Sequence, residues 1–144
     1  MAVQIERQLK CKEIWGGSSA VNNAVSTPGL DIRVDAQPYM GQERGGDIYF
    51  CSMCGAGAIT RMVLADVAGH GQVVSDLSSS LFDLMNQYIN IPDQTELVDA
   101  INRAFCRQST DGRFATAIVA TYWAPTDELL VCNAGHPRPL WYRA

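Results

Sequence analysis

Two β-like runs joined by a short glycine turn constrain the fold of this chain most strongly. The first run is Asp47–Cys54 (DIYFCSMC), and the second covers residues 59–66 (ITRMVLAD). The link between them is Gly-Ala-Gly-Ala. A short glycine-containing link between two apolar runs is typical of an antiparallel β-hairpin. We therefore predict that the two runs pair with each other.

The register of this hairpin predicts that two aspartates meet at its open end. Pairing Cys54 with Ile59 carries the ladder back to Asp47 opposite Asp66. Directly opposed residues point to the same face, with Cα atoms about 5 Å apart. Two carboxylates at that distance repel each other unless a proton or a cation lies between them. A register shift of one residue would move the side chains to the other face, so separate aspartates that bond to nearby backbone N–H groups are the alternative.

Both faces of the predicted hairpin are apolar, which indicates that both are covered. One face carries Tyr49, Cys51, Met53, Met62 and Leu64, and the other carries Ile48, Phe50, Val63 and Ala65. Such a hairpin belongs inside a layered sandwich and presents its charged end at a mouth.

The rest of the chain predicts strands, two adjacent helices and then more strands. We expect a short helix over residues 1–14 and a polar loop over residues 16–29. Strands are predicted at Leu30–Ala36, 114–123 and 129–133, with another beginning at 140–142, and helices at 72–90 and, capped by Asp93, at 94–107. This order indicates an α+β fold with a largely antiparallel sheet, not alternating βαβ units.

Composition and charge narrow the classes of partner. The net charge is −4 and no basic block occurs, which argues against nucleic acid as the main partner. No apolar run approaches the roughly 20 residues that a membrane span needs, and residues 1–10 do not resemble a signal peptide. We therefore expect a cytoplasmic protein that binds neither nucleic acid nor membrane.

The chain has five cysteines, and Cys51 and Cys54 form a single CxxC pair. A structural zinc site needs about four ligands, and no second pair of Cys or His completes one. We interpret the two cysteines as ordinary strand and turn residues, with zinc or redox chemistry as the alternative.

Glycines flank both aspartates of the predicted pair. Gly45 and Gly46 precede Asp47, and Gly69-His70-Gly71 lies between Asp66 and a predicted helix. Glycine permits unusual backbone dihedrals, and a helix N-terminus offers free N–H groups to an anion. Carboxylates for a hard cation beside N–H donors for a phosphate predict a phosphoester site.

Three motifs together make a family resemblance. Gly45-Gly46-Asp47, residues 65–71 (ADVAGHG) and residues 133–137 (NAGHP) occur in this order. The set resembles the metal-dependent protein phosphatases, in the bacterial SpoIIE-like branch that regulates stress and sporulation sigma factors. The resemblance covers about residues 30–142. It implies an α–β–β–α sandwich, with two antiparallel sheets each covered by helices and a binuclear Mn²⁺ or Mg²⁺ centre at one edge.

The resemblance also implies roles for individual residues. Asp66 would bridge the two metals, the carbonyl of Val67 would bind one, and Asp47 would bind directly or through water. A metal-bound water would hydrolyse phosphoserine or phosphothreonine, typically on a small regulatory protein of the anti-anti-sigma type.

The resemblance implies further metal-binding aspartates after NAGHP, whereas this sequence ends at Ala144. We therefore expect a C-terminally incomplete phosphatase domain over residues 30–144, preceded by the helix and loop of residues 1–29. A non-catalytic binding module, a pseudophosphatase with an incomplete metal site, is the alternative. Missing strands would leave an apolar edge near residues 140–142, and exposed edges favour homo-oligomers.

Other residues near the motifs are weighed individually. Arg44 is a candidate ligand for substrate phosphate, or a solvated loop arginine. His70 is a candidate proton donor to the leaving serine oxygen, or it holds its loop, and Gly69 and Gly71 are candidate substrate-binding positions beside it. We interpret His136 as a structural turn histidine, with Asn133 supporting the same turn.

Overall fold

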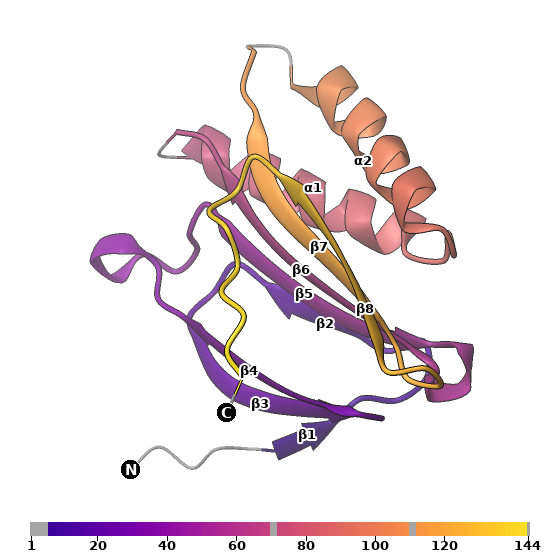
Figure 1. Cartoon of the computed structure of the whole chain (residues 1–144). Helices are drawn as coiled ribbons and strands as arrows, with labels where there is room; N and C mark the ends of the chain where they lie inside the picture. The colour runs from indigo at the N-terminus through magenta and orange to yellow at the C-terminus, as the bar shows by residue number, and fades with distance from the viewer. Residues whose placement is uncertain (1–5, 70–71, 110–111, 144) are drawn as a thin grey trace.

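Two β-sheets of unequal size face each other in the computed structural model of the chain, which describes residues 6–69, 72–109 and 112–143 (Figure 1). The large sheet has the strand order β2-β5-β6-β7-β8, and the small sheet has the order β1-β3-β4. The large sheet contains β2 (Ile14–Gly17), β5 (Asp47–Cys54), β6 (Ile59–Val67), β7 (Ala115–Trp123) and β8 (Glu128–Ala134). The small sheet contains β1 (Glu6–Gln8), β3 (Val21–Thr27) and β4 (Leu30–Ala36).

The β5–β6 hairpin has the predicted register. Cys54 pairs with Ile59, and the ladder carries Asp47 to a position directly opposite Asp66. The turn is a short 3₁₀ segment, Gly55–Gly57, in which Ala56 has φ +55°. Two flanking glycines with positive φ allow this tight turn, since glycine adopts left-handed backbone at little cost.

The N-terminal part of the chain differs from the prediction. The helix expected over residues 1–14 is wrong for the described part, because residues 6–8 and 14–17 are strands. The polar loop expected over residues 16–29 is also wrong, because β3 pairs with β4 along its whole length. Val25 points into the core with 1% of its surface exposed, so burial and pairing outweigh the polar composition of this strand.

The expected division between residues 29 and 30 falls in the turn of the β3–β4 hairpin. The small sheet thus includes residues from both sides of that division. Its first strand, β1, runs parallel to β3.

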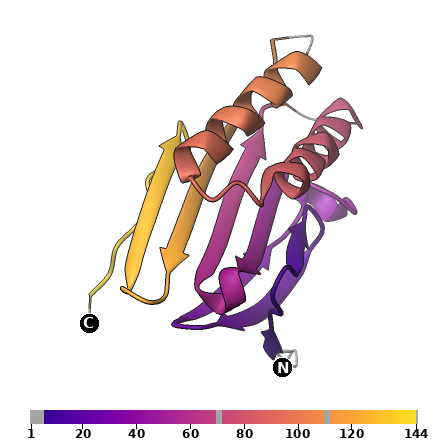
Figure 2. The ribbon, with the colours of Figure 1, turned by 90° about the vertical axis from the view of Figure 1, so that its right-hand side faces the viewer.

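Both helices cover the same face of the large sheet (Figure 2). They are α1 (Gln72–Tyr88) and α2 (Gln94–Gln108), close to the predicted ranges. Asp93 caps α2, as predicted, by accepting a 2.9 Å hydrogen bond from the backbone N–H of Glu96. The α+β sandwich is confirmed, and within the described ranges no helix lies on the outer face of the small sheet. None of the helices described is both long and apolar enough to cross a membrane.

Two apolar cores fill the layers. The core between the helices and the large sheet includes Ile48, Phe50, Val63, Leu81, Leu97 and Phe105. The core between the two sheets includes Leu9, Val25, Cys51 and Met53. The predicted hairpin therefore contributes to both, as its two apolar faces require.

The two sheets are tied together at the end remote from the aspartates. The hydroxyl of Thr60 donates a buried 3.0 Å hydrogen bond to that of Thr27. Gly29, with φ +83°, packs so closely on Tyr122 that an added Cβ would lie 2.4 Å from the phenol oxygen. Figure 1 shows the sheets close together near the β5–β6 turn and splayed apart toward the opposite end.

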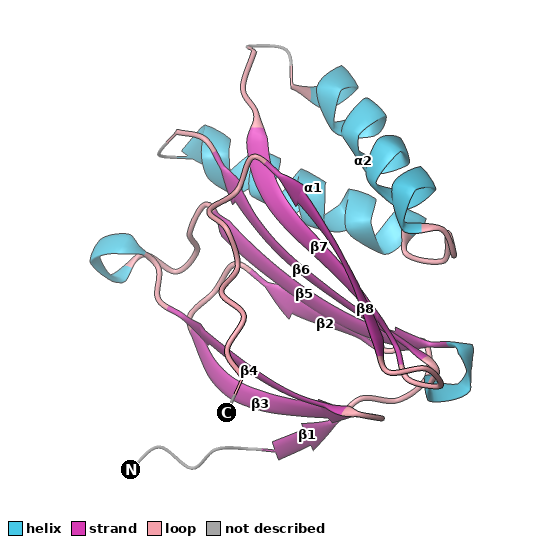
Figure 3. Cartoon of the chain, viewed as in Figure 1, coloured by secondary structure: helices cyan, strands magenta, loops and turns pink. Residues whose placement is uncertain are grey.

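The strand expected to begin at residues 140–142 is not formed. These residues are loop (Figure 3), and Leu140 has 98% of its surface exposed. After β8 the chain folds back, and Gly135 makes an isolated parallel bridge to Ala117 of β7. The chain thereby leaves the edge of the large sheet, and an apolar composition alone does not make a strand without a pairing partner.

Candidate functional site

Asp47 and Asp66 lie side by side where β5 begins and β6 nears its end. Both residues are exposed. Partial burial of the carboxyl group raises the pKa of Asp47, the negative charge of Asp66 raises it further, and His136 opposes the change. The pair thus has the electrostatic character of a cation site, because a bound cation would relieve the repulsion between the carboxylates.

The absence of a side chain at Gly46 leaves room among the oxygens of the site. A Cβ built there would lie 3.2 Å from the carbonyl oxygen of Val67 and 3.4 Å from Oδ1 of Asp66. The carbonyl of Gly46 accepts hydrogen bonds from the N–H of Val67, at 3.2 Å, and from the buried hydroxyl of Ser78, at 3.3 Å. The glycine therefore lets the two strand ends and helix α1 approach one another closely.

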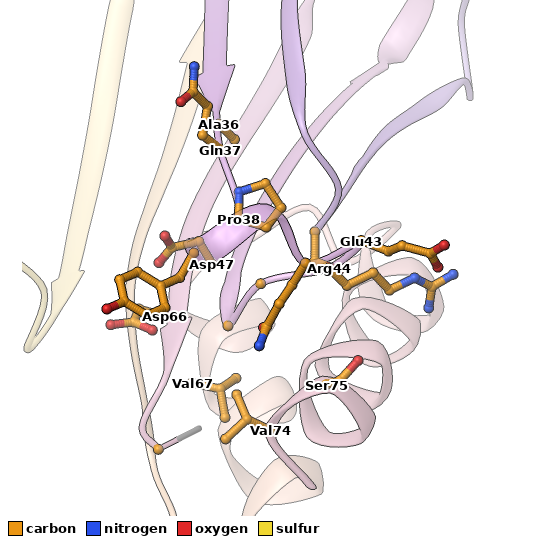
Figure 4. A pocket seen from close by; sticks show the side chains of 16 residues that line it. Ala36, Gln37, Pro38, Glu43, Arg44, Asp47, Asp66, Val67, Val74 and Ser75 are labelled. Atoms are coloured by element: carbon orange, nitrogen blue, oxygen red, sulfur yellow. The ribbon is translucent and has the colours of Figure 1, made fainter. Parts of the chain in front are cut away.

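A cavity of about 920 Å³ opens beside the aspartates (Figure 4). The connection between β4 and β5 forms one wall, and the end of β6 and the start of α1 form the other. Its lining includes Ala36, Pro38, Tyr39, Arg44, Asp47, Asp66, Val67, Gly69 and Ser75. This cavity is large enough for a phosphorylated side chain, since small-molecule sites typically measure about 300–1,000 Å³.

Arg44 lies on the rim of the cavity rather than against the aspartates. Its Nη1 donates a long hydrogen bond of 3.4 Å to the hydroxyl of Ser79. Figure 4 shows the side chains of Arg44 and Glu43 extending away from Asp47 and Asp66. Arg44 is therefore placed to meet a ligand entering the cavity, and its hydrogen-bond partner among the described residues is the neutral hydroxyl of Ser79.

The residues present fit a hard divalent cation. Asp47 and Asp66 offer carboxylate oxygens, and Val67 offers a carbonyl oxygen next to them. Oxygen ligands of these kinds suit Mg²⁺ and Mn²⁺. Over the residues that the structure describes, no group of three or more His, Cys, Asp or Glu side chains gathers as a metal cluster.

The predicted roles of His70 and Gly71 lie outside the described residues. Gly69 is described, lines the cavity and has φ +124°. An added Cβ there would lie 2.8 Å from Nη1 of Arg113 and 2.9 Å from Cγ2 of Val74. Glycine is thus favoured at this position by its dihedral and by the closeness of Val74.

The structure brings two further residues to the aspartates that the sequence reasoning did not place there. Thr116 of β7 pairs directly with Asp66, and its Oγ1 lies 2.9 Å from Nδ1 of His136. We call Asp47, Asp66 and Thr116 the polar row, since they follow one another across three strands. The proximity arises from long-range pairing, so nothing in the local sequence indicates it.

The cysteines do not form a second site among the described residues. All five are free thiols. Cys51 is buried between the sheets, and burial raises the pKa of its thiol to about 12. A thiol with so high a pKa is a poor nucleophile and metal ligand, which disfavours the redox or zinc alternative.

Comparison with known families identifies the chain. The family model for stage II sporulation protein E (SpoIIE) matches residues 57–144, more than half of the chain. The match includes Asp66, Val67 and His136, whereas Asp47 precedes it. Neither a curated protein nor a solved structure matches the chain. The chain therefore belongs to the SpoIIE family, and with it to the SpoIIE-like branch of the metal-dependent protein phosphatases.

Proposed function

We propose that the protein is a Mn²⁺- or Mg²⁺-dependent protein serine/threonine phosphatase. The observation that carries this proposal is the directly opposed pair Asp47–Asp66, with the carbonyl of Val67 beside it, at the wall of a cavity in a SpoIIE-family chain. Repelling carboxylates at a solvent-accessible mouth are costly unless they serve a cation.

The residues of the site have distinct tasks in this reaction. Asp47, Asp66 and the carbonyl of Val67 hold metal, which when bound supplies an activated water and neutralises phosphoryl oxygens. Arg44 at the rim attracts the phosphate and orients it by charge-assisted hydrogen bonds. Gly69 adds no side chain to its own part of the cavity wall. We assign proton donation to the leaving oxygen to His70, with Gly71 beside it.

The substrate in this proposal is phosphoserine or phosphothreonine on a small regulatory protein of the anti-anti-sigma type, in the cytoplasm. An exposed phosphorylated segment would reach the cavity from the Arg44 side. The edge strand β8 carries exposed Leu129, Leu130 and Val131, which supports self-association as a further proposal.

The test is hydrolysis of a phosphoserine peptide by the purified chain with Mn²⁺ and with EDTA. We expect turnover with Mn²⁺ only, and at least a 100-fold loss in Asp66→Asn. Asp99→Asn is the matched control, because Asp99 is an exposed α2 residue whose carboxylate pairs with Arg103. Absence of Mn²⁺-dependent turnover would refute the phosphatase proposal, as would equal activity in the two variants.

A binding module without catalysis is the second candidate. The described residues bring together two carboxylates and one carbonyl, which favours weak or single-site metal binding. Calorimetric titration with Mn²⁺ separates the candidates. Tight binding at two sites contradicts the binding module, whereas one weak site without turnover supports it.

A further inference from the structure

The polar row continues onto a fourth residue that comes from beyond β8. Asp47, Asp66 and Thr116 occupy paired positions on β5, β6 and β7, so their side chains point to the same face of the large sheet. The imidazole of His136 adds to the row through Thr116, with 2.9 Å between Nδ1 and Oγ1. The ring also lies within electrostatic reach of Asp47. Four side chains from four segments thus converge at one end of the sheet.

The turn that carries His136 is held firmly on both sides. The side-chain amide of Asn133 donates a 2.9 Å hydrogen bond to the carbonyl of His136, and its oxygen accepts one of 2.8 Å from the N–H of His136. Gly135, with φ +74°, bridges to Ala117 of β7. The backbone of His136 is therefore held by contacts that do not involve its ring. Together with the Thr116 contact they set the position of the ring without a bound ligand.

One of the two ring nitrogens of His136 is available to a ligand. Nδ1 is engaged by Thr116, while Nε2 has no hydrogen-bond partner among the described residues. The residue is half-buried. The Asn133 hydrogen bonds already hold the turn in place, and the Thr116 contact adds to them. Holding the turn therefore does not require Nε2. The free nitrogen belongs to a ring that lies within electrostatic reach of Asp47, where a phosphoryl group bound to a metal at the aspartate pair would present further oxygens.

We propose that His136 is a phosphate-binding residue, whose Nε2–H donates a hydrogen bond to a phosphoryl oxygen held at the Asp47–Asp66 pair. This inference rests on the proposed function and assigns to the NAGHP turn a contact with the substrate. In this role Thr116 is a positioning residue, since its hydroxyl donates to Nδ1, which keeps the proton of the neutral ring on Nε2 and fixes which way the ring faces. A preorganised donor of this kind costs no reorganisation when the phosphate arrives.

The experiment measures binding of inorganic phosphate to the full chain in saturating Mn²⁺ by calorimetry, together with the Mn²⁺ affinity of each variant. We expect His136→Ala to weaken phosphate binding by about 10- to 100-fold, the range for loss of a charge-assisted hydrogen bond. The Mn²⁺ affinity should stay within about threefold. Thr116→Val should lose part of the phosphate affinity, and Thr116→Ser should restore it.

Three results would overturn the inference. These are unchanged phosphate affinity in His136→Ala, a parallel loss of Mn²⁺ affinity, which would make the ring a metal ligand, and a wild-type protein that binds Mn²⁺ but no phosphate. Circular dichroism shows whether His136→Ala folds, and the Thr116 pair decides the matter if it does not. Phosphate binding is measured without turnover, so a wild-type chain that binds phosphate through His136 but hydrolyses nothing refutes the phosphatase and leaves this inference standing.

Discussion

Asp47→Asn should change the stability of the protein in opposite directions without and with metal. The two carboxylates lie on opposed residues with Cα atoms about 5 Å apart, and unit charges at that distance repel by about 0.8 kcal/mol at the dielectric constant of water. Both residues are exposed, so the water-like value is the appropriate one. Removing the charge of Asp47 should therefore stabilise the metal-free protein by about 1 kcal/mol.

The pH dependence follows from the same pair. The pKa of Asp47 in the folded protein lies above its ordinary value of 3.8, because of burial and the charge of Asp66. The folded state then holds its proton longer than the unfolded state, so this group makes stability fall as pH rises from about 3.8 through the raised pKa. Asp47→Asn should remove that fall.

Mn²⁺ should make the wild type more stable than Asp47→Asn, the reverse of their order without metal. A ligand at 100 times its Kd stabilises the folded state by about 2.7 kcal/mol, and Asp47→Asn should lose most of this gain. Urea unfolding followed by circular dichroism, at pH 7 with EDTA and with Mn²⁺, measures both effects. Asp99→Asn is again the control and should match the wild type in both buffers. If Asp47→Asn is less stable than the wild type in EDTA, or keeps the full gain from Mn²⁺, the reasoning about the pair is refuted.

Three further substitutions test parts of the fold that support the site. Arg61 has 3% of its surface exposed and donates to the carbonyls of Ile89, at 2.6 Å, and Pro92, at 2.5 Å, in the α1–α2 connection. Arg61→Met should lower the free energy of unfolding in urea by about 3 kcal/mol, because it leaves both carbonyls without a donor. Gly69→Ala should cost about 1–3 kcal/mol and lower phosphatase activity, because its φ of +124° strains any residue with a Cβ and that Cβ would lie 2.9 Å from Cγ2 of Val74. Asp93→Ala should cost about 1 kcal/mol by removing the cap of α2 while leaving Mn²⁺ affinity unchanged, as thermal unfolding and calorimetry would show.

The central hairpin could be predicted from sequence because its information is local. The glycine turn fixes the pairing of Cys54 with Ile59, and the period-two pattern then carries the register to Asp47 and Asp66 without reference to the rest of the chain. The cap of α2 is local in the same way. Strand β3 is not predicted because its sequence, VNNAVST, is largely polar; its pairing with both β1 and β4 and the burial of Val25 and Thr27 stabilise it as a strand.

The candidate site divides along the same line. Asp47 and Asp66 were found because they close one hairpin. Thr116, His136 and Ser78 reach the site from β7, from the turn after β8 and from α1, so their proximity depends on how distant segments pack. A histidine in a Gly-His-Pro turn gives no sign by itself that its ring contacts Thr116, which pairs with Asp66.

The two sheets are joined at one end and splayed apart at the other (Figure 1), so their separation is least constrained at the splayed end. The contacts of Thr27 with Thr60 and of Gly29 with Tyr122 join the sheets at one end, and Ala36 and Asp47, which line the cavity, lie at the opposite ends of their strands. A small rotation of the small sheet about these contacts would move Ala36, at the cavity wall, much further than it moves Thr27. Substitutions of Thr27 or Gly29, far from the aspartates, should therefore change the width of the cavity and the size of the phosphorylated segment that it admits.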